Sequence, residues 1–214
     1  MVMPEVPAPG VQVALRNLVI LPGPGAGTSG ITMTAGDRLS VERCLIHGLV
    51  SGAALHVSTG ALVEVTDSIL RNNGNGVLAE NLASIDIAGS KIVGNSSHGV
   101  FVNALVAGGT TVTISDTILS DNMVGARALA SASGAVGRIY ANRVTAAKNT
   151  TVGLASEATG SGVAILSVGN SLVDKNATGI LQSGTSASVR SLGDNYVADN
   201  GTDVTGTLTA LAPR

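Results

Sequence analysis

Aromatic residues are almost absent from this chain, which has no Trp, one Phe and two Tyr among its 214 residues. A globular core of this size normally takes much of its volume from several aromatic side chains. Hydrophobic residues nevertheless make up 44% of the chain, and most of them are Val, Ile, Leu and Ala. We therefore expect a thin core that is built from small and branched aliphatic side chains.

Charge and cysteine are also scarce. Charged residues form 12% of the chain, about half the usual share. The sequence has no basic run and no set of aromatic platforms, which excludes a typical nucleic-acid-binding surface. No apolar run approaches the roughly 20 residues of a membrane-spanning helix. The single Cys44 excludes an internal disulfide and a Cys-rich metal site.

A repeat of about 25 residues runs through the chain, and the segments TDSILRNNGNGV (66–77) and GSKIVGNSSHGV (89–100) show it most clearly. After an aliphatic anchor such as Val65, a small polar residue follows at three positions, an aliphatic residue at five, Asn at eight and Gly at eleven. Successive anchors lie 22 to 29 residues apart. The anchors are Leu15, Val41, Val65, Ile87, Ile114, Ile139, Val168 and Leu192.

Each repeat has the pattern of short strands. Apolar and polar residues alternate around the anchors, as in VEVTD (63–67) and VTISD (112–116), which predicts half-buried strands. Gly, Asn and Ser separate these runs as turn residues do. Three short strands per repeat, stacked in parallel, form a solenoid of about eight coils in which stacking buries the inward faces. We expect residues 1–12 to form a Pro-rich lead-in, residues 13–208 this single domain, and residues 209–214 a tail.

Recurring polar residues predict two columns at the corners of the coils. An asparagine side chain both donates and accepts hydrogen bonds, so asparagines stacked at the strand spacing of about 4.8 Å can form a ladder. This ladder also accounts for four matches to the N-glycosylation sequon, at Asn95, Asn149, Asn176 and Asn200. The predicted ladder contains Asn73, Asn95, Asn122, Asn149, Asn176 and Asn200. A second column contains Ser68, Ser90, Thr117, Asn142, Ser171 and Asn195, and Cys44 falls in it as a buried structural thiol.

The segments VEVTDSILRNNGNGV, VTISDTILSDNMVG and SVRSLGDNYVADNGTDV resemble those of right-handed parallel β-helix repeat proteins of bacteria, within the pectate-lyase-like class. The resemblance covers residues 13–208 and implies an all-β, single-stranded right-handed parallel β-helix. Many such proteins are secreted, so the resemblance implies an extracellular or cell-surface location. The N-terminal residues MVMPEVPAPG themselves predict no signal peptide.

Two neighbouring acidic residues are candidates for chemistry. Glu64 and Asp86 each lie one residue before an anchor in adjacent repeats, so their carboxylates are expected about 5 Å apart. Such a pair can act as general acid and base, or can bind Ca²⁺, the one cofactor that the sequence suggests. Pectate lyases that resemble this fold add an arginine, which here would have to be Arg43 or Arg138. The alternative is a solvated face that carries two acids by chance.

His98 is a further candidate, because some β-helix glycosidases that resemble this class use a Gly-His-Gly segment. In this chain Ser97 precedes His98, and no tandem Asp pair accompanies it. The alternative is therefore a histidine in a surface turn. No pair of histidines has the spacing of a metal site.

Three functions remain open. We favour a non-catalytic β-solenoid scaffold or binding module over a polysaccharide lyase or glycoside hydrolase acting on acidic glycans. Carbohydrate clefts usually carry aromatic faces, and this chain offers only Phe101, Tyr140 and Tyr196, while its longest insertions (22–30 and 155–164) are short. The third function is end-to-end assembly into a homo-oligomer. It is suggested because the N-terminal residues predict no capping helix, although the polar residues 201–214 can cap the other end.

Overall fold

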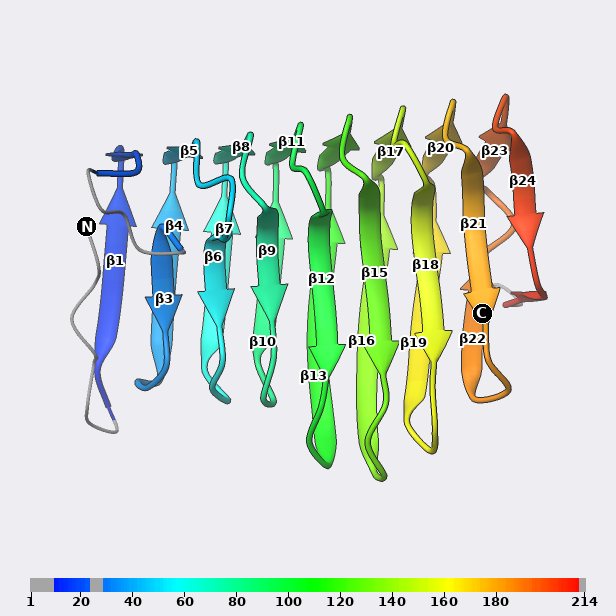
Figure 1. Cartoon of the computed structure of the whole chain (residues 1–214), viewed down its shortest axis with the longest axis horizontal. Coiled ribbons are helices and arrows are strands. Elements are labelled where there is room, and N and C mark those ends of the chain that lie inside the picture. The colour runs from blue at the N-terminus through cyan, green and yellow to red at the C-terminus, as the bar shows by residue number, and fades with distance from the viewer. Residues whose placement is uncertain (1–9, 24–28, 212–214) are drawn as a thin grey trace.

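The computed structural model describes residues 10–23 and 29–211. Most of the expected lead-in, part of the insertion at 22–30 and the last residues of the tail lie outside these ranges. The described residues contain strands and turns but no helix, and so no helix that could cross a membrane. Figure 1 shows the chain winding through successive coils that are stacked side by side from the N-terminal to the C-terminal end.

The strands of the described residues form three parallel sheets, which we call sheets A, B and C. Sheet A contains, in spatial order, β1 (Gln12–Arg16), β4 (Arg38–Glu42), β7 (Leu62–Thr66), β10 (Ser84–Ala88), β13 (Gly108–Ser115), β16 (Ala135–Asn142), β19 (Val163–Gly169), β22 (Ala187–Ser191) and β25 (Leu208–Ala210).

Sheets B and C have eight strands each within the same residues. Sheet B contains β2 (Val19–Ile20), β5 (Leu45–His47), β8 (Ile69–Arg71), β11 (Lys91–Val93), β14 (Ile118–Ser120), β17 (Thr145–Ala147), β20 (Leu172–Asp174) and β23 (Tyr196–Ala198). Sheet C contains β3 (Ile31–Met33), β6 (Ala53–Val57), β9 (Asn75–Ala79), β12 (His98–Ala104), β15 (Val124–Ala130), β18 (Val152–Ala158), β21 (Thr178–Ser183) and β24 (Thr202–Thr205).

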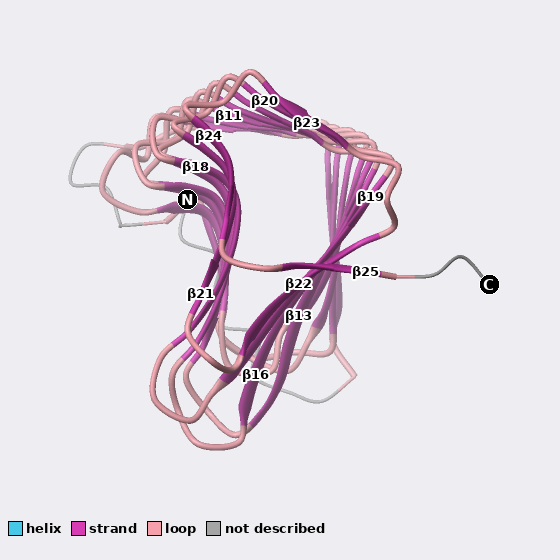
Figure 2. Ribbon diagram, turned by 90° about the vertical axis from the view of Figure 1, so that its right-hand side faces the viewer, coloured by secondary structure: helices cyan, strands magenta, loops and turns pink. Residues whose placement is uncertain are grey.

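Viewed along the stack, the three sheets enclose one narrow interior (Figure 2). Every neighbouring pair within a sheet is parallel, and each strand pairs with the strand one coil away, as in β7, β10 and β13. The prediction of an all-β parallel solenoid is therefore confirmed, and the expected number of about eight coils matches the eight or nine strands of each sheet in the described residues.

The interior is filled by rows of aliphatic side chains that follow the coils. One row in sheet A contains Leu39, Val63, Ile85, Val112, Ile139, Leu166 and Val189, each at most 2% exposed. The burial of such a side chain stabilises the fold by about 2 kcal/mol. A coil cannot bury these residues alone, so stability depends on the contact between neighbouring coils.

Two of the predicted anchors are wrong. Ile114 lies in register with Ala141, and Val168 lies in register with Ser191. The anchor row therefore continues through Ala141 and Ser191, and not through Ile139 and Leu192. Ile139 belongs to the neighbouring row of the core, and the anchor of its coil is Ala141, whose small side chain does not stand out as a large aliphatic residue in the sequence. Leu192 is 44% exposed because the chain turns outward after β22.

The six predicted ladder asparagines stack in one column at the corner between sheets B and C. Each side-chain oxygen from Asn95 onward accepts hydrogen bonds from the backbone N–H and the amide of the asparagine one coil earlier, at 2.9 to 3.3 Å. Each amide also donates to a backbone carbonyl of the preceding coil. The column ends at Asp203, whose Oδ1 accepts hydrogen bonds from the backbone N–H and from the side-chain amide of Asn200.

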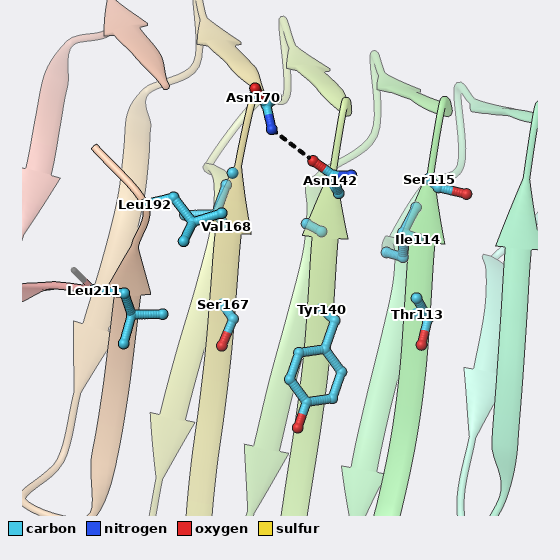
Figure 3. Close-up of a pocket in the computed structure, with 12 residues that line it drawn as sticks. Thr113, Ile114, Ser115, Tyr140, Asn142, Ser167, Val168, Asn170, Leu192 and Leu211 are labelled. Atoms are coloured by element: carbon cyan, nitrogen blue, oxygen red, sulfur yellow. Dashed lines mark hydrogen bonds between the residues drawn. The ribbon is translucent and has the colours of Figure 1, made fainter. Parts of the chain in front are cut away.

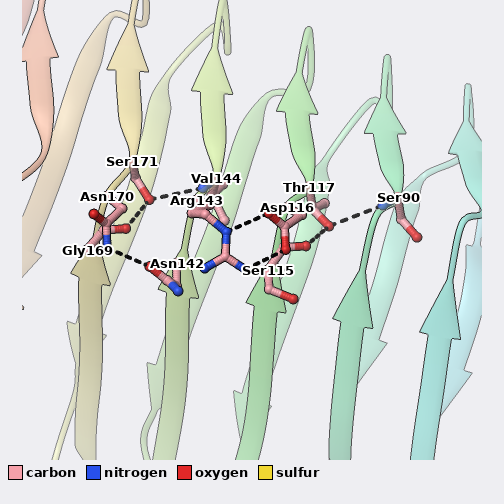
Figure 4. Close-up of polar contacts among 10 residues, drawn as sticks. All are labelled: Ser90, Ser115, Asp116, Thr117, Asn142, Arg143, Val144, Gly169, Asn170 and Ser171. Atoms are coloured by element: carbon pink, nitrogen blue, oxygen red, sulfur yellow. Dashed lines mark hydrogen bonds and ion pairs between the residues drawn. The ribbon is translucent and has the colours of Figure 1, made fainter.

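The second polar column follows the corner between sheets A and B (Figure 4). Each hydroxyl accepts the backbone N–H of the residue one coil earlier, as Thr117 does from Ser90 and Ser171 from Val144, and it donates to the carbonyl two residues before it. Val144 occupies this column in the sixth coil, so the prediction of Asn142 there is wrong. The misplaced anchor at Ile139 caused this error. Cys44, 2% exposed, begins the column.

Candidate functional site

Glu64 and Asp86 lie side by side on the outer face of sheet A, in direct register on β7 and β10. Glu64 also forms an ion pair with Arg38 of the neighbouring strand β4. Arg38 is in register with Leu62, two residues before Glu64 on β7. This ion pair occupies one of the two carboxylates that a general acid–base pair or a Ca²⁺ site would need. Within residues 10–23 and 29–211, no three His, Cys, Asp or Glu side chains are grouped closely enough to hold a metal ion.

The other three candidates do not join this acidic pair. Arg138 lies on β16, two strands beyond Asp86, and its guanidinium extends toward Gly109, since a Cβ at that glycine would meet Nη1 at 2.6 Å. Arg43 forms its ion pair with Glu42. His98 begins β12 in sheet C, on a different face of the solenoid. The structure therefore does not bring Glu64, Asp86, Arg138 and His98 into one site.

His98 is buried, so the alternative interpretation of a surface turn histidine is wrong. The residue is 7% exposed, and its ring stacks on Phe101 at 4.3 Å between centroids. Its Nδ1 lies 2.8 Å from Ser97 Oγ and 3.1 Å from Asn75 Oδ1. Burial, and after it the positive charge of Arg127, lowers the pKa of this imidazole from 6.5 to about 4. His98 is therefore neutral at physiological pH.

The outer face of sheet C carries a polar cluster that the sequence analysis missed. His56 Nε2 lies 2.9 Å from Glu80 Oε2, and the Asn103 amide donates to the other oxygen of Glu80. Arg127 pairs with Glu157 at 2.6 Å and lies over the ring of Phe101. Within the described residues, Arg127 Nε and the neighbouring His98 Nε2 are buried without a hydrogen-bond partner, so the cluster is not fully paired. The ion-pair partners lie in adjacent coils but are offset by two residues, since His56 is in register with Leu78 and Glu157 with Leu129. Polar residues that recur at outward positions of sheet C are the signal that could have revealed them.

A groove of about 380 Å³ lies on the outer face of sheet A, nearer the C-terminal end (Figure 3). Its floor is formed by the ends of β13, β16 and β19, and Tyr140 lies at its centre. The described residues that line this groove, which we call the sheet A groove, are Thr113, Ile114, Ser115, Tyr140, Ala141, Asn142, Ser167, Val168, Gly169, Asn170, Leu192 and Leu211.

The outward turn after β22 forms one wall of the groove. Leu192 lies over Gly169, where a Cβ would meet Leu192 Cδ1 at 2.5 Å, so the absence of a side chain at position 169 makes room for it. The Leu211 N–H donates to the Ser191 carbonyl at 2.7 Å and holds the segment after β25 beside the same turn. The groove therefore depends on two leucines that no repeat position specifies.

Charged and amide side chains form a network at the upper rim of the groove (Figure 4). Asp116 and Arg143, at the same corner of adjacent coils, form a two-point ion pair at 2.6 and 2.7 Å. The hydrogen bonds from Arg143 lower the pKa of Asp116, so this carboxylate stays ionised. Beside them, Asn170 donates to Asn142 Oδ1 at 3.1 Å. These contacts hold the rim in place, and the charges of Asp116 and Arg143 pair with each other.

The family model for the right-handed β-helix region matches residues 14–200. The chain therefore belongs to the right-handed β-helix family, and this also gives the hand of the coils. No curated protein matches the chain.

The sheet A groove is the best candidate site in the described residues. Ligand sites in proteins are concave, largely apolar and furnished with a few polar groups that orient the ligand. The groove combines an exposed aromatic ring, two leucines and a rim of hydroxyls and amides. It contains none of the four residues that the sequence suggested for catalysis.

Proposed function

We propose that this protein is a non-catalytic β-helix binding module that acts outside the cell or at its surface and takes a polysaccharide in the sheet A groove. The observation that carries the proposal is the exposed ring of Tyr140 in a concave site, because aromatic rings are the usual platforms for sugar rings. The dispersal of Glu64, Asp86, Arg138 and His98 over two sheets and several coils supports binding without turnover. The location is inferred from the resemblance to secreted β-helix proteins.

A binding assay combined with a reducing-end assay tests this proposal. We expect immobilised polysaccharides to retain the wild-type protein, and we expect no release of new reducing ends, with or without Ca²⁺. Retention of the Tyr140→Ala variant should be weaker. A protein that binds no polysaccharide, or that releases products, would contradict the proposal.

A second candidate function is a polysaccharide lyase or hydrolase that acts on acidic glycans through Glu64 and Asp86. The register of these two residues on β7 and β10 favours it, because side chains at paired positions lie close together. In that case Ca²⁺ would bind at the same pair. Product release that is abolished both by Glu64→Ala and by Asp86→Ala would establish this function, whereas absence of products would exclude it for the glycans tested.

A further inference from the structure

We propose that the sheet A groove takes a neutral sugar, whose ring stacks on Tyr140, rather than an acidic one. This inference rests on the proposed function and names its ligand class. It follows from the charges around the groove, the position of Tyr140 and the shape of the site.

The charges around the groove favour a neutral ligand. All the described residues that line it are uncharged. At the rim, Asp116 and Arg143 form an ion pair with each other, and Asp194 Oδ1 accepts the Asn170 N–H at 2.9 Å. A carboxylate placed in the groove would lose water without a dedicated cationic partner in the lining, and such desolvation is costly.

Besides Arg143 at the rim, two more arginines lie near the groove without lining it. Arg138 shares a strand face with Tyr140, but its guanidinium extends to Gly109 on β13, away from the groove. Arg190 is in register with Ser167, one strand beyond it, on the exposed side of β22. Neither residue is among those that line the groove, so an acidic sugar ring stacked on Tyr140 would find no cationic side chain in the lining itself.

The surroundings of Tyr140 suit a ring with an apolar face and a polar edge. Tyr140 is 42% exposed, and Figure 3 shows its ring lying along β16 with one face toward solvent. Thr113 and Ser167 are in register with it on the two neighbouring strands, so a hydroxyl lies on each side at the strand spacing of about 4.8 Å. A sugar has C–H groups for the aromatic face and hydroxyls for these neighbours.

The shape of the groove agrees with this ligand class. Its volume of about 380 Å³ lies within the usual range for small-ligand sites, roughly 300–1,000 Å³. Leu192 and Leu211 add an apolar wall on the side of the C-terminal coil. The wall and the ring of Tyr140 together can cover the apolar parts of a sugar, while the hydroxyl rim orients it.

The test compares neutral and acidic polysaccharides. Affinity electrophoresis is carried out with soluble β-glucan and mannan as neutral probes, and with alginate and polygalacturonate as acidic probes, at low and high salt. We expect a neutral probe to bind with little dependence on salt, because screening acts only on charges. Tyr140→Ala should weaken this binding about tenfold, equivalent to 1.4 kcal/mol, and Tyr140→Phe should retain most of it.

The chain offers a matched control in Tyr196, its other tyrosine, which lies on sheet B and is 61% exposed. Tyr196→Ala should bind like the wild type, and the melting temperatures of all variants show whether they fold. Salt-sensitive binding of an acidic probe alone would overturn this inference but leave the proposed function standing. Neutral binding that survives Tyr140→Ala would overturn the placement at this ring. Binding of no probe would overturn both proposals.

Discussion

Asn122 lies in the middle of the asparagine ladder and is completely buried. Its Oδ1 accepts two hydrogen bonds from Asn95, and its amide donates to Ile92 and Asn149. A buried donor that loses its acceptor costs about 1–3 kcal/mol. The ladder therefore adds specific polar contacts to a core whose aliphatic rows are otherwise much alike from coil to coil.

We predict that Asn122→Leu lowers the free energy of unfolding by about 3 kcal/mol, because it leaves the two Asn95 donors without their acceptor. Asn142→Leu is the control, since it removes one exposed hydrogen bond to Asn170 and should cost less than about 1 kcal/mol. Urea denaturation of both variants measures the difference. Equal losses would mean that the ladder is not a special source of stability.

His98 makes stability depend on pH. Its pKa is about 4 in the folded protein and 6.5 in the unfolded chain, so between these values the unfolded chain binds more protons. Stability contributed by this group is complete above pH 6.5 and falls as the pH drops toward 4, by about 3 kcal/mol. His98→Gln should remove this part of the pH dependence, whereas His47→Gln should not. Identical pH profiles for wild type and His98→Gln would refute this assignment.

At the scale of the strand, close contact between coils explains the glycine of each repeat. Gly125 is the second residue of β15 and lies beside the ladder. A Cβ at this position would lie 2.4 Å from the Gly153 carbonyl oxygen and 3.0 Å from Asn149 Nδ2. Equivalent contacts occur at Gly76, Gly99, Gly153 and Gly179. The Gly that follows five of the six ladder asparagines therefore lets the next coil approach to the distance that strand pairing requires, and Asp203 takes this position after Asn200.

We predict that Gly125→Ala destabilises the protein by about 1–3 kcal/mol, the usual cost of overpacking, because its neighbour is backbone that cannot move aside alone. Gly23→Ala is the matched control, since nothing lies within 4 Å of a Cβ at that position. Thermal unfolding of the two variants provides the comparison. A Gly125→Ala protein as stable as the control would show that the coils can separate without loss.

The repeat made the fold predictable from the sequence, because the ladder and the aliphatic rows recur at the same place in each coil. The prediction failed where a coil departs from the pattern. Ala141 is smaller than the predicted anchors, and Leu192 lies one residue after the true anchor of its coil, Ser191. The sheet A groove could not be predicted for the same reason. The groove depends on Leu192, on Leu211 and on the position of Tyr140 on the outer face of sheet A. The position of Tyr140 is set by the register of β16.

At the scale of the whole molecule, residues 201–214 were expected to cap the C-terminal end, but within the described residues β23, β24 and β25 each lie at the edge of a sheet without a further strand. Residues 201–211 are all exposed, and Val204 on β24 presents an apolar side chain that is 37% exposed at the end of the interior. Asp203 closes the asparagine ladder there, but the strand edges of the last coil have no partner within the described residues. Open edges favour association with other strands, so the proposal of end-to-end assembly into a homo-oligomer can be tested here.

We predict that the mass measured by light scattering rises with protein concentration and that Val204→Lys suppresses this rise, since a charge on an edge strand opposes pairing. Val163→Lys is the control, because Val163 is equally exposed, at 38%, but lies on β19 away from the open end. If the wild type has the mass of one chain at all concentrations, or if both variants behave alike, assembly through this end is excluded.

The central claim is that the sheet A groove binds a ligand without transforming it. The most direct measurement is an NMR titration of the labelled protein with neutral oligosaccharides, with the sugar signals followed in the same samples. The account predicts that shift changes gather at Thr113, Tyr140 and Ser167, and that the sugar stays intact. Changes centred on Glu64 and Asp86, or the appearance of cleaved sugar, would contradict it.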